Sequence, residues 1–440
     1  MRPLRPHGRS LLLMLLVACS AACNRARPDG DEAAPPAVSQ LLADQSAVVC
    51  LSDPGATGPL DQTLRAEQDK ARKLSLSPDR WIQVARAWVK KARQASDPSL
   101  YHQVDRCVDL VLRLDPASLV ALDLRALVLR NEHRFEEARV VAAQVLERDP
   151  KDFAALGLLS DALLELGKFE EAAKAAQRLM DERPDAAAHA RGAYLRWLAG
   201  DVTGAKALWK EALASGRDAR DPGSTAWMFT QAGLLYFHEA DYDGADAVLA
   251  QAERWVPDYP AALVARGRVA LAQGKPSVAI GHLERAWKGD PLPETAWLLG
   301  DARALAGDER GAKGAYDDAV KLGRRIDRLT LAHFLATKGR DLEEARTAIE
   351  EERRTRGGVY VEDVYAWVLY RLGRIPEAKQ AIERATQLGT PDARLLFHLG
   401  AIELAGGNAE GRKHLRQALR RNPGFDLTSA AEVRRLLGER

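Results

Sequence analysis

The chain has 440 residues, of which 46% are hydrophobic and 29% charged, a balance typical of folded globular proteins. This length exceeds one ordinary hydrophobic core, so the chain must form several domains or an array of units that each pack on their neighbours. Because 64 Lys and Arg residues nearly cancel 62 Asp and Glu residues, no strong positive field is available to attract phosphate backbones, and we expect no nucleic-acid partner.

The first residues predict an export signal. Arg2, Arg5 and Arg9 precede an uncharged apolar run over residues 11–17, which is too short to span a bilayer and has the charge order of a secretory signal. The first 18 residues are therefore interpreted as a signal peptide and not as part of the fold.

The apolar run ends in Leu16-Val17-Ala18-Cys19, with an aliphatic residue three before the cysteine and a small one just before it. This segment resembles the lipobox of bacterial lipoproteins. The resemblance implies cleavage after Ala18, acylation of Cys19 and a lipid anchor in the bacterial cell envelope, with Ser20 favouring the outer membrane facing the periplasm. The alternatives are acylation of Cys23 and an ordinary signal peptide or uncleaved anchor in which the cysteine has no role.

Residues 24–59 are rich in Ala, Pro, Asp and Gly, so we expect residues 19–59 to form a flexible tether. The four cysteines are too scattered for paired metal ligands, and we expect no metal site. In an oxidising compartment Cys50 and Cys107 could form a disulfide. The favoured alternative is that Cys107 is a buried helix residue and Cys50 a free thiol in the tether.

Residues 60–116 predict a capping helix followed by a degenerate first repeat. The stretch over 60–74 is compatible with a helix, and Ser77-Pro78-Asp79 has the pattern of a helix start. A second helix is expected to end at Leu114-Asp115-Pro116. The alternative is a helical cap that is unrelated to the repeats.

A helical hairpin then recurs along the chain. Arg134-Phe135-Glu136-Glu137-Ala138 is followed 34 residues later by Lys168-Phe169-Glu170-Glu171-Ala172. The alanine that opens each second helix can be followed through Ala138, Ala172, Ala205, Ala245, Ala279, Ala312, Ala345 and Ala378 to Gly411, with successive spacings of 34, 33, 40, 34, 33, 33, 33 and 33.

This spacing resembles the tetratricopeptide repeat. The resemblance implies an all-α solenoid of antiparallel helix pairs forming a right-handed superhelix, with nine repeats over residues 117–423 and a capping helix within 424–440. Closely packed helices need small residues where their axes approach, and the first helices supply them at Ala126, Ser160, Ala193, Gly233, Gly267, Gly300, Ala366 and Gly400. The turns within the pairs have glycine where a left-handed residue ends the first helix, at Gly167, Gly200, Gly274, Gly307, Gly339 and Gly373.

Two stretches depart from the pattern. The spacing of 40 arises from a polar loop over residues 215–223, which we expect to act as a joint. The seventh repeat has His333 and Glu352 where small residues belong, and it ends in Arg356-Gly357-Gly358 without the usual proline. Its packing is therefore expected to differ from that of the other repeats.

No catalytic constellation is present, so we predict a protein that is not an enzyme and needs no cofactor. His238-Glu239 begins a zinc-protease motif, but Tyr242 stands where the second histidine is required. Gly274-Lys275 resembles part of a phosphate loop, but Val269 replaces its first glycine.

The first helices are expected to line the concave face, which in this family binds peptides. Aromatic residues with scattered charges suit such a groove because Trp, Tyr and Arg dominate interface energies. The predicted partner-binding residues are Tyr194, Trp197, Trp227, Phe237, Arg268, Trp297, Asp301, Phe334, Tyr360, Asp363, Trp367 and Tyr370. The alternative is that the large apolar members belong to the core between helices.

The sequence thus predicts a membrane-anchored lipoprotein scaffold that binds a protein or peptide through the concave groove and assists assembly of an envelope or secretion complex. One alternative is a non-catalytic accessory subunit that positions an enzyme acting on envelope polysaccharide or peptidoglycan. Another is an interaction module that faces the cytoplasm on an uncleaved anchor.

Overall fold

The structure is a computed structural model that describes residues 38–55 and 57–438. Within these residues it contains twenty-four α-helices, a short 3-10 helix over Pro98–Leu100 and no strand, which confirms the all-α fold class. The signal peptide, Cys19 and Cys23 lie outside the described residues.

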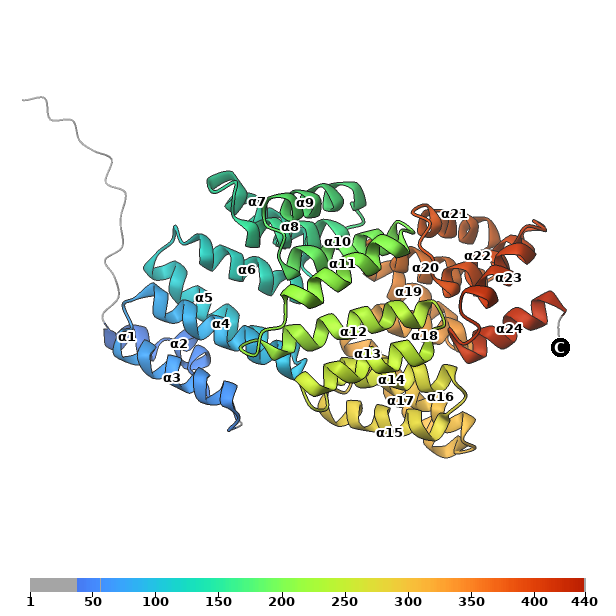
Figure 1. Cartoon of the computed structure of the whole chain (residues 1–440), viewed down its shortest axis with the longest axis horizontal. Helices are drawn as coiled ribbons and strands as arrows, with labels where there is room; N and C mark the ends of the chain where they lie inside the picture. The colour runs from blue at the N-terminus through green and yellow to red at the C-terminus, as the bar shows by residue number, and fades with distance from the viewer. Residues whose placement is uncertain (1–37, 56, 439–440) are drawn as a thin grey trace, which may run out of the picture. The chain divides into compact units, whose positions relative to one another are not determined.

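The helices form successive antiparallel pairs that stack along the chain (Figure 1). The degenerate first pair is α4 (Pro78–Ala95) and α5 (Tyr101–Leu114). The next five pairs are α6 (Leu119–Asn131) with α7 (Phe135–Arg148), α8 (Phe153–Glu165) with α9 (Phe169–Glu182), α10 (Ala186–Leu198) with α11 (Val202–Ser215), α12 (Pro222–His238) with α13 (Tyr242–Trp255), and α14 (Pro260–Ala272) with α15 (Pro276–Gly289). The last four are α16 (Pro293–Leu305) with α17 (Glu309–Ile326), α18 (Arg328–Lys338) with α19 (Leu342–Glu352), α20 (Val359–Arg371) with α21 (Ile375–Thr386), and α22 (Ala393–Ala405) with α23 (Gly411–Arg421). A final helix, α24 (Leu427–Leu437), packs on the last pair, with Val433 in the shared core.

Small residues let the two helices of a pair approach each other. A Cβ atom added at Gly267 would lie 2.6 Å from Cγ of Leu283, and one at Gly233 would lie 2.6 Å from Cγ of Leu249. Ser160 is buried and its hydroxyl donates a hydrogen bond to the carbonyl of Ala172 at 2.9 Å. The predicted reason for the small-residue pattern is therefore confirmed.

The turns within the pairs are closed by left-handed residues. All the glycines predicted at this position have positive φ, as at Gly167 (76°) and Gly274 (70°). His133 and Ala240 occupy the same turn position in two repeats without glycine and also have positive φ (59° and 61°). The turn geometry is thus kept even where the favourable residue is missing.

The C-terminal part of the expected tether contains helices, and the tether prediction is wrong for residues 38–50. Helices α1 (Val38–Ala43) and α2 (Gln45–Cys50) precede α3 (Pro59–Lys73), which was predicted as a capping helix. Leu41 and Ala47 are buried and belong to the same core as α4 and α5. The sequence signal was weak because α1 and α2 are only six residues long each.

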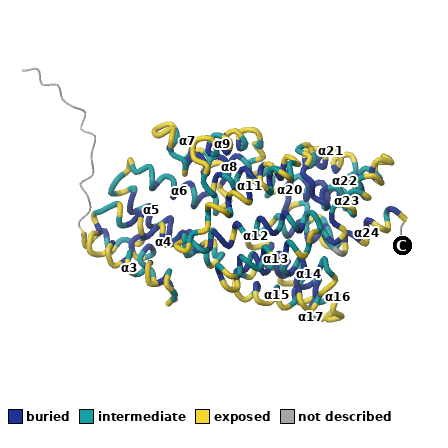
Figure 2. Tube along the Cα trace, in the orientation of Figure 1, coloured by how far each residue is buried: buried dark blue, intermediate teal, exposed yellow. Residues whose placement is uncertain are grey.

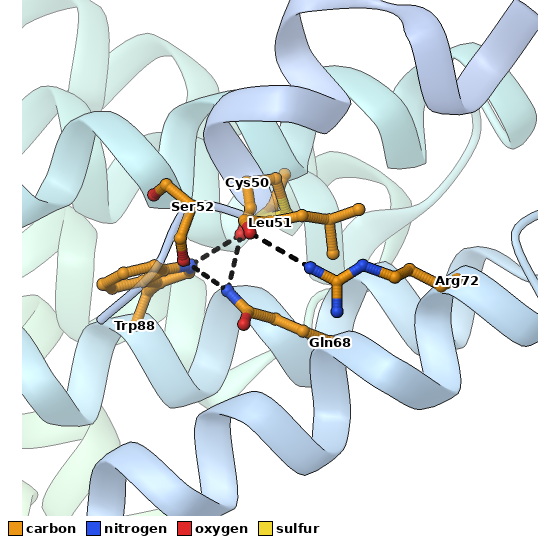
Figure 3. Close-up of a disulfide and its surroundings, with 7 residues drawn as sticks. Cys50, Leu51, Ser52, Gln68, Arg72 and Trp88 are labelled. Atoms are coloured by element: carbon orange, nitrogen blue, oxygen red, sulfur yellow. Dashed lines mark hydrogen bonds between the residues drawn. A yellow bond between two sulfur atoms is a disulfide. The ribbon is translucent and has the colours of Figure 1, made fainter. Parts of the chain in front are cut away.

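A disulfide between Cys50 and Cys107 joins α2 to α5, so the favoured alternative of two unpaired cysteines is wrong. Figure 3 shows the surroundings of this bond. The indole nitrogen of Trp88 donates to the carbonyl of Cys50 at 2.8 Å, and the amide of Gln68 donates to the carbonyl of Ser52 at 2.8 Å. The end of α2 is thus held by one covalent bond and by buried hydrogen bonds to α3 and α4.

The long loop over residues 215–223 lies against the first pair instead of forming a free joint. Arg93 at the end of α4 pairs with Asp221 at 3.3 Å. Gly223 lies so close to α4 that a Cβ atom there would be 2.7 Å from the backbone nitrogen of Gln94. The extra residues in this repeat therefore connect α12 to α4.

Turns that lie about 190 residues apart in sequence contact one another at three places. We call these three contacts the closure seam. In the first contact, the backbone N–H of Gly357 donates to the carbonyl of Glu165 at 2.8 Å, and Nε of Arg356 pairs with the Glu165 carboxylate at 2.6 Å. A Cβ atom at Gly167 would lie 2.9 Å from the nitrogen of Gly358, so both turns need glycine for this approach. The irregular end of the seventh repeat is therefore a docking point for the turn between α8 and α9.

The other two contacts of the seam follow one and two repeats later. The hydroxyl of Thr390, between α21 and α22, donates to the carbonyl of Leu198 at 2.6 Å. The side-chain amide of Asn422, after α23, donates to the carbonyl of Phe237 at 2.8 Å and accepts from the hydroxyl of Tyr242 at 2.5 Å. Three successive turns in the earlier repeats, after α8, α10 and α12, thus each contact one turn in the later repeats.

The seam gives the two sets of repeats a common core. One buried cluster contains Ala193, Trp197 and Leu235 from α10 and α12 together with Leu369 and Leu395 from α20 and α22. The parts of α10 and α12 that carry these residues consequently face the interior and not an open groove.

Candidate partner-binding surfaces

Most of the predicted groove residues are inside the protein. Figure 2 shows the buried residues in dark blue where helices face one another and the exposed residues in yellow along the outer turns. The buried members of the predicted set are Trp197, Phe237, Trp297, Phe334, Asp363 and Trp367, and the half-buried members are Arg268, Asp301, Tyr360 and Tyr370. These ten residues do not form the predicted open groove, because the later repeats cover the concave face or their own neighbours surround them.

Asp363 on α20 is the centre of the interior network. Its side chain is fully buried and accepts a hydrogen bond from Nδ1 of His398 at 2.7 Å and from Nε of Arg394 at 3.1 Å. Both partners lie on α22, four residues apart, so one face of that helix presents them to the same carboxylate. A buried carboxylate needs such partners because an unpaired charge inside a protein is costly.

Aromatic rings surround this charge cluster. The ring of Trp367 stacks on His398 with centroids 4.2 Å apart, and it contacts Tyr370 at 4.9 Å. Arg394 lies over the ring of Tyr360 at 5.4 Å. Trp367 therefore acts as packing for the ion pair and not as a binding residue.

The same cluster reaches the earlier repeats across the seam. The indole nitrogen of Trp197 donates to the hydroxyl of Tyr360 at 3.4 Å, and the ring of Trp197 lies 4.7 Å from that of His238. Asp392, which caps α22, lies 3.8 Å from Nδ1 of His238. Residues from α10, α12, α20 and α22 thus share one interior polar network.

Burial sets the protonation of this network. It lowers the pKa of His238, although Asp392 opposes the shift, and it lowers the pKa of His333 well below its usual value. Burial alone would raise the pKa of Asp392, but His238 and Arg394 hold it below its usual value. Burial also raises the pKa of Tyr360 well above its usual value. His238 and His333 are therefore neutral near pH 7 while Asp392 is charged.

Two further predicted residues are engaged within their own neighbourhoods. Asp301 accepts from the hydroxyl of Tyr316 at 2.6 Å and from Nζ of Lys338 at 2.5 Å. Arg268 forms an ion pair with Glu294. Both side chains already have partners of opposite charge or polarity within the chain, so neither is free to recruit a peptide.

Tyr194 and Trp227 are the two predicted residues that remain exposed, at 36% and 44%. Trp227 on α12 packs edge-on against Trp209 of α11, with centroids 5.9 Å apart. Tyr194 on α10 is 36% exposed as a residue, while burial and the nearby Glu165 carboxylate raise the pKa of its hydroxyl. Both lie on first helices of neighbouring repeats, where the family fold places its concave face.

A ladder of charges accompanies these aromatic residues. Asp161 on α8 forms a two-point ion pair with Arg191 on α10, at 2.8 and 2.9 Å, and lies 3.6 Å from Arg130 on α6. We call Arg130, Asp161, Arg191, Tyr194 and Trp227 the open face. It offers two exposed aromatic side chains, which are among the residues that most often anchor protein interfaces, whereas its two arginines are half-buried and paired with Asp161.

Sequence reasoning missed His398, Arg394 and Asp392, which organise the interior network. Asp392 two residues before Arg394 has the pattern of a helix N-cap, but nothing in the sequence indicates that it faces His238 from a segment about 150 residues away. The charge partner of Asp363 is likewise visible only after α20 and α22 are placed side by side.

The described residues contain no cluster of three or more His, Cys, Asp or Glu side chains that could hold a metal ion. Among the helices of residues 38–55 and 57–438, none is both long and apolar enough to cross a membrane.

Family models described as tetratricopeptide repeat match residues 129–193, 230–292, 264–330 and 366–424, which together cover about half of the chain. No curated protein matches the sequence.

Several solved structures are similar in fold. A tetratricopeptide repeat protein from Parabacteroides merdae is 16% identical, with 56% of this chain and 97% of that chain covered and a TM-score of 0.38. A human IFIT1 dimer with PPP-AAAA is 16% identical, with 86% and 95% covered and a TM-score of 0.48. The Pseudomonas aeruginosa pilF protein is 21% identical, with 49% and 96% covered and a TM-score of 0.35. At these identities the likeness concerns the fold alone.

Proposed function

Because the chain belongs to the tetratricopeptide-repeat proteins, we propose that it is a protein-binding scaffold without catalytic activity of its own. The open face carries this proposal. Tyr194 and Trp227 are exposed on neighbouring first helices, although large aromatic residues are usually buried in such arrays. Exposed aromatic residues beside arginines are the side chains expected at the centre of a protein interface.

We further propose that the scaffold is anchored in a bacterial envelope through acylated Cys19 and assists assembly of an envelope or secretion complex. The Cys50–Cys107 disulfide supports an exported protein, because disulfides persist in oxidising compartments and are rare in the cytosol. The partner is a protein or peptide and not nucleic acid.

Affinity capture from membranes tests the open face. The full chain is compared with a Tyr194→Ala/Trp227→Ala variant and with a Leu305→Ala/Ile326→Ala control, which removes two other exposed apolar side chains, 53% and 47% exposed, from α16 and α17. We expect the first variant to capture the partner at least tenfold less well, because hot-spot truncations cost about 2 kcal/mol or more each. The control should capture it normally, and both variants should keep the wild-type melting temperature within about 2 °C, as surface changes usually do.

Equal capture by the first variant and the wild type would exclude the open face as the binding site. The identity of the captured protein also decides the role of the scaffold. A catalytic chain that acts on polysaccharide or peptidoglycan would make this protein an accessory subunit, and a structural envelope component would support the assembly role.

Metabolic labelling with a palmitate analogue tests the anchor independently. We expect incorporation in the wild type and its loss in Cys19→Ala, with Cys23→Ala as the control that keeps the label. Unchanged labelling of Cys19→Ala would contradict acylation at this residue. Protease treatment of spheroplasts, whose opened outer membrane admits the protease to the periplasm but not to the cytoplasm, distinguishes an exported chain, which is digested, from one that faces the cytoplasm, which is protected.

A further inference from the structure

A second surface lies at the last repeat, in a cleft of about 510 Å³ bounded by α22, α23 and the turn between α21 and α22. The apolar side chains of Leu396 and Leu399 on α22, together with Pro391, line one part of the cleft. Gln417, Arg420 and Arg421 on α23 line another. The cleft therefore combines apolar surface with cationic groups.

The charge of this cleft is not balanced locally. Helix α23 carries Arg412, Lys413, His414, Arg416, Arg420 and Arg421 and no acidic residue. The cleft lining includes three of these basic residues and no Asp or Glu. His414 is paired with Glu403 at 2.6 Å, whereas the side chains of Arg420 and Arg421 form no ion pair or hydrogen bond with another described residue.

A cleft between α15, α16 and α17 provides a comparison within the same solenoid. It measures about 230 Å³, and its lining contains Glu284 and Asp318 as well as Lys288 and Arg303. Glu284 and Arg303 pair with each other at 2.9 Å. Charges in that cleft neutralise one another, so the two unpaired arginines at the last repeat are not a general consequence of the repeat.

We propose that the cleft at α22 and α23 binds an acidic peptide segment of the partner, with its carboxylates on Arg420 and Arg421 and its apolar side chains on Leu396 and Leu399. This inference rests on the proposed function as a protein-binding scaffold and gives it a second contact site. Arginine suits the role because its planar guanidinium binds carboxylates through two parallel hydrogen bonds. The apolar surface supplies the affinity that exposed ion pairs alone do not give.

The chemistry of the cleft favours a peptide over other anions. No aromatic side chain lines it, so bases of a single-stranded nucleic acid would have no ring on which to stack. Its volume lies in the range that encloses a few side chains, whereas the flat surface of an anionic membrane would leave its apolar lining uncovered.

The cleft also borders the closure seam. Gly389 and Thr390 line it, and the hydroxyl of Thr390 makes the seam hydrogen bond to Leu198. A peptide in the cleft therefore contacts the same turn that joins the later repeats to the earlier ones. Its binding should slow hydrogen exchange in the turn over residues 387–392.

The test uses the full chain in a non-ionic detergent and a dye-labelled probe peptide, Leu-Asp-Glu-Leu-Asp-Glu-Leu, measured by fluorescence anisotropy. The test variant is Arg420→Glu/Arg421→Glu. The matched control is Arg412→Glu/Lys413→Glu, which makes the same change of charge on the same helix outside the cleft. An Arg420→Gln/Arg421→Gln variant replaces the test variant if charge reversal lowers the melting temperature. The probe with lysine in place of every acidic residue, a thymidine 20-mer and phosphatidylglycerol vesicles serve as competitors.

We expect the acidic probe to bind the wild type and to lose at least tenfold in affinity with the cleft variant, but less than threefold with the matched control. Leu399→Ser should also weaken binding, because the apolar surface contributes. Equal losses in the test and control variants would overturn the proposal, because they would indicate diffuse attraction to the basic helix. Displacement of the probe by the oligonucleotide or the vesicles, but not by unlabelled acidic peptide, would also overturn it. Because the assay measures a defined peptide directly, its failure leaves capture through the open face unaffected.

Discussion

The two parts of the concave face have the same kind of sequence and different roles. On α10 and α12, Tyr194 and Trp227 are exposed, and the nearby charges form a ladder between neighbouring helices. On α20 and α22, Trp367 and Asp363 are buried, and so is their partner His398, while Arg394 is half-buried. Both sets lie on first helices and both combine aromatic rings with charges.

The difference arises from contacts between distant segments. The later repeats are held against the earlier ones by the closure seam, whose hydrogen bonds join turns separated by 191 residues at Arg356 and 192 residues at Thr390. A concave face that faces another part of the same chain becomes core, while one that faces solvent keeps its aromatic residues available. The aromatic content of a solenoid groove is thus a poor guide to binding unless the path of the solenoid is known.

The largest expected effect on stability distinguishes Trp367 from Trp227. Trp367→Ala should lower the free energy of unfolding by about 3–5 kcal/mol, because it removes a buried ring and leaves a cavity beside His398. Trp227→Ala should change it by less than about 1 kcal/mol, because the ring is 44% exposed. Denaturant unfolding followed by far-UV circular dichroism measures both. Similar losses in the two variants would contradict the division of the concave face.

As with the two tryptophans, replacing the buried Asp363 should cost more stability than replacing the part-exposed Asp161. Asp363→Ala leaves the buried His398 and the half-buried Arg394 without their carboxylate, and we expect a loss of about 3 kcal/mol. Asp161→Ala, on the part-exposed ladder of the open face, should cost about 1 kcal/mol or less. A double variant of Asp363 and His398 that loses no more than the single variant would support coupling between these two groups.

Acidification should weaken the interior network first. His238 and His333 have lowered pKa values in the fold, so the unfolded chain takes up protons more readily below its ordinary histidine pKa. Stability should therefore fall as the pH decreases from about 7 to 5.5, by up to about 1.4 kcal/mol for each histidine that stays neutral. Asp392 does not contribute in this window, because a lowered carboxyl pKa adds stability that is lost only at more acidic pH.

The charged and titratable groups near His238 and His333 include Asp392, Arg268, Arg394 and His398. A control variant must therefore leave these four groups unchanged. Replacing the exposed His102 by glutamine should leave the pH dependence unchanged. Replacing His333 by phenylalanine should make it shallower. A pH profile that is unaltered by His333→Phe would exclude this residue as a source of acid sensitivity.

The smallest expected effect on global stability concerns a hydrogen bond of the closure seam. Asn422→Ala removes the hydrogen bonds to Phe237 and Tyr242 and should cost about 1 kcal/mol globally. Its local effect should be larger, with faster hydrogen exchange in the turns after α12 and α23. Asn408→Ala, at an exposed turn outside the seam, is the matched control. Equal exchange in the two variants would indicate that the Asn422 contact does not hold the turns together.

Sequence alone predicted the repeat well because its signal is local. The small residues at Gly233 and Gly267 and the left-handed glycines in the turns are required within each helix pair, whatever lies beyond it. The family and the all-α class follow from them and are confirmed. Helices α1 and α2 escaped detection because six-residue helices have little periodicity and depend on the disulfide and on burial against α3 to α5.

The candidate site was less accessible to sequence reasoning. Trp197 and Tyr360 have the composition of groove residues, and only their contact across 163 residues reveals that they pack on each other. Arg356-Gly357-Gly358 was recognised as irregular, but the role of that irregularity depends on Glu165 and Gly167 in another repeat. Contacts of this kind depend on the accumulated twist of many repeats, which no local pattern fixes.

Hydrogen exchange at Gly357 tests the closure of the solenoid most directly. Its backbone N–H donates to the carbonyl of Glu165 across the seam, so protection of this amide depends on the contact between the early and late repeats. We expect exchange in the turn over residues 355–358 to be at least 100-fold slower than in an unstructured peptide of the same sequence, and to accelerate in Glu165→Ala/Gly167→Val. Exchange at the unstructured rate in the wild type would contradict a closed seam and would reopen the later concave face to a partner.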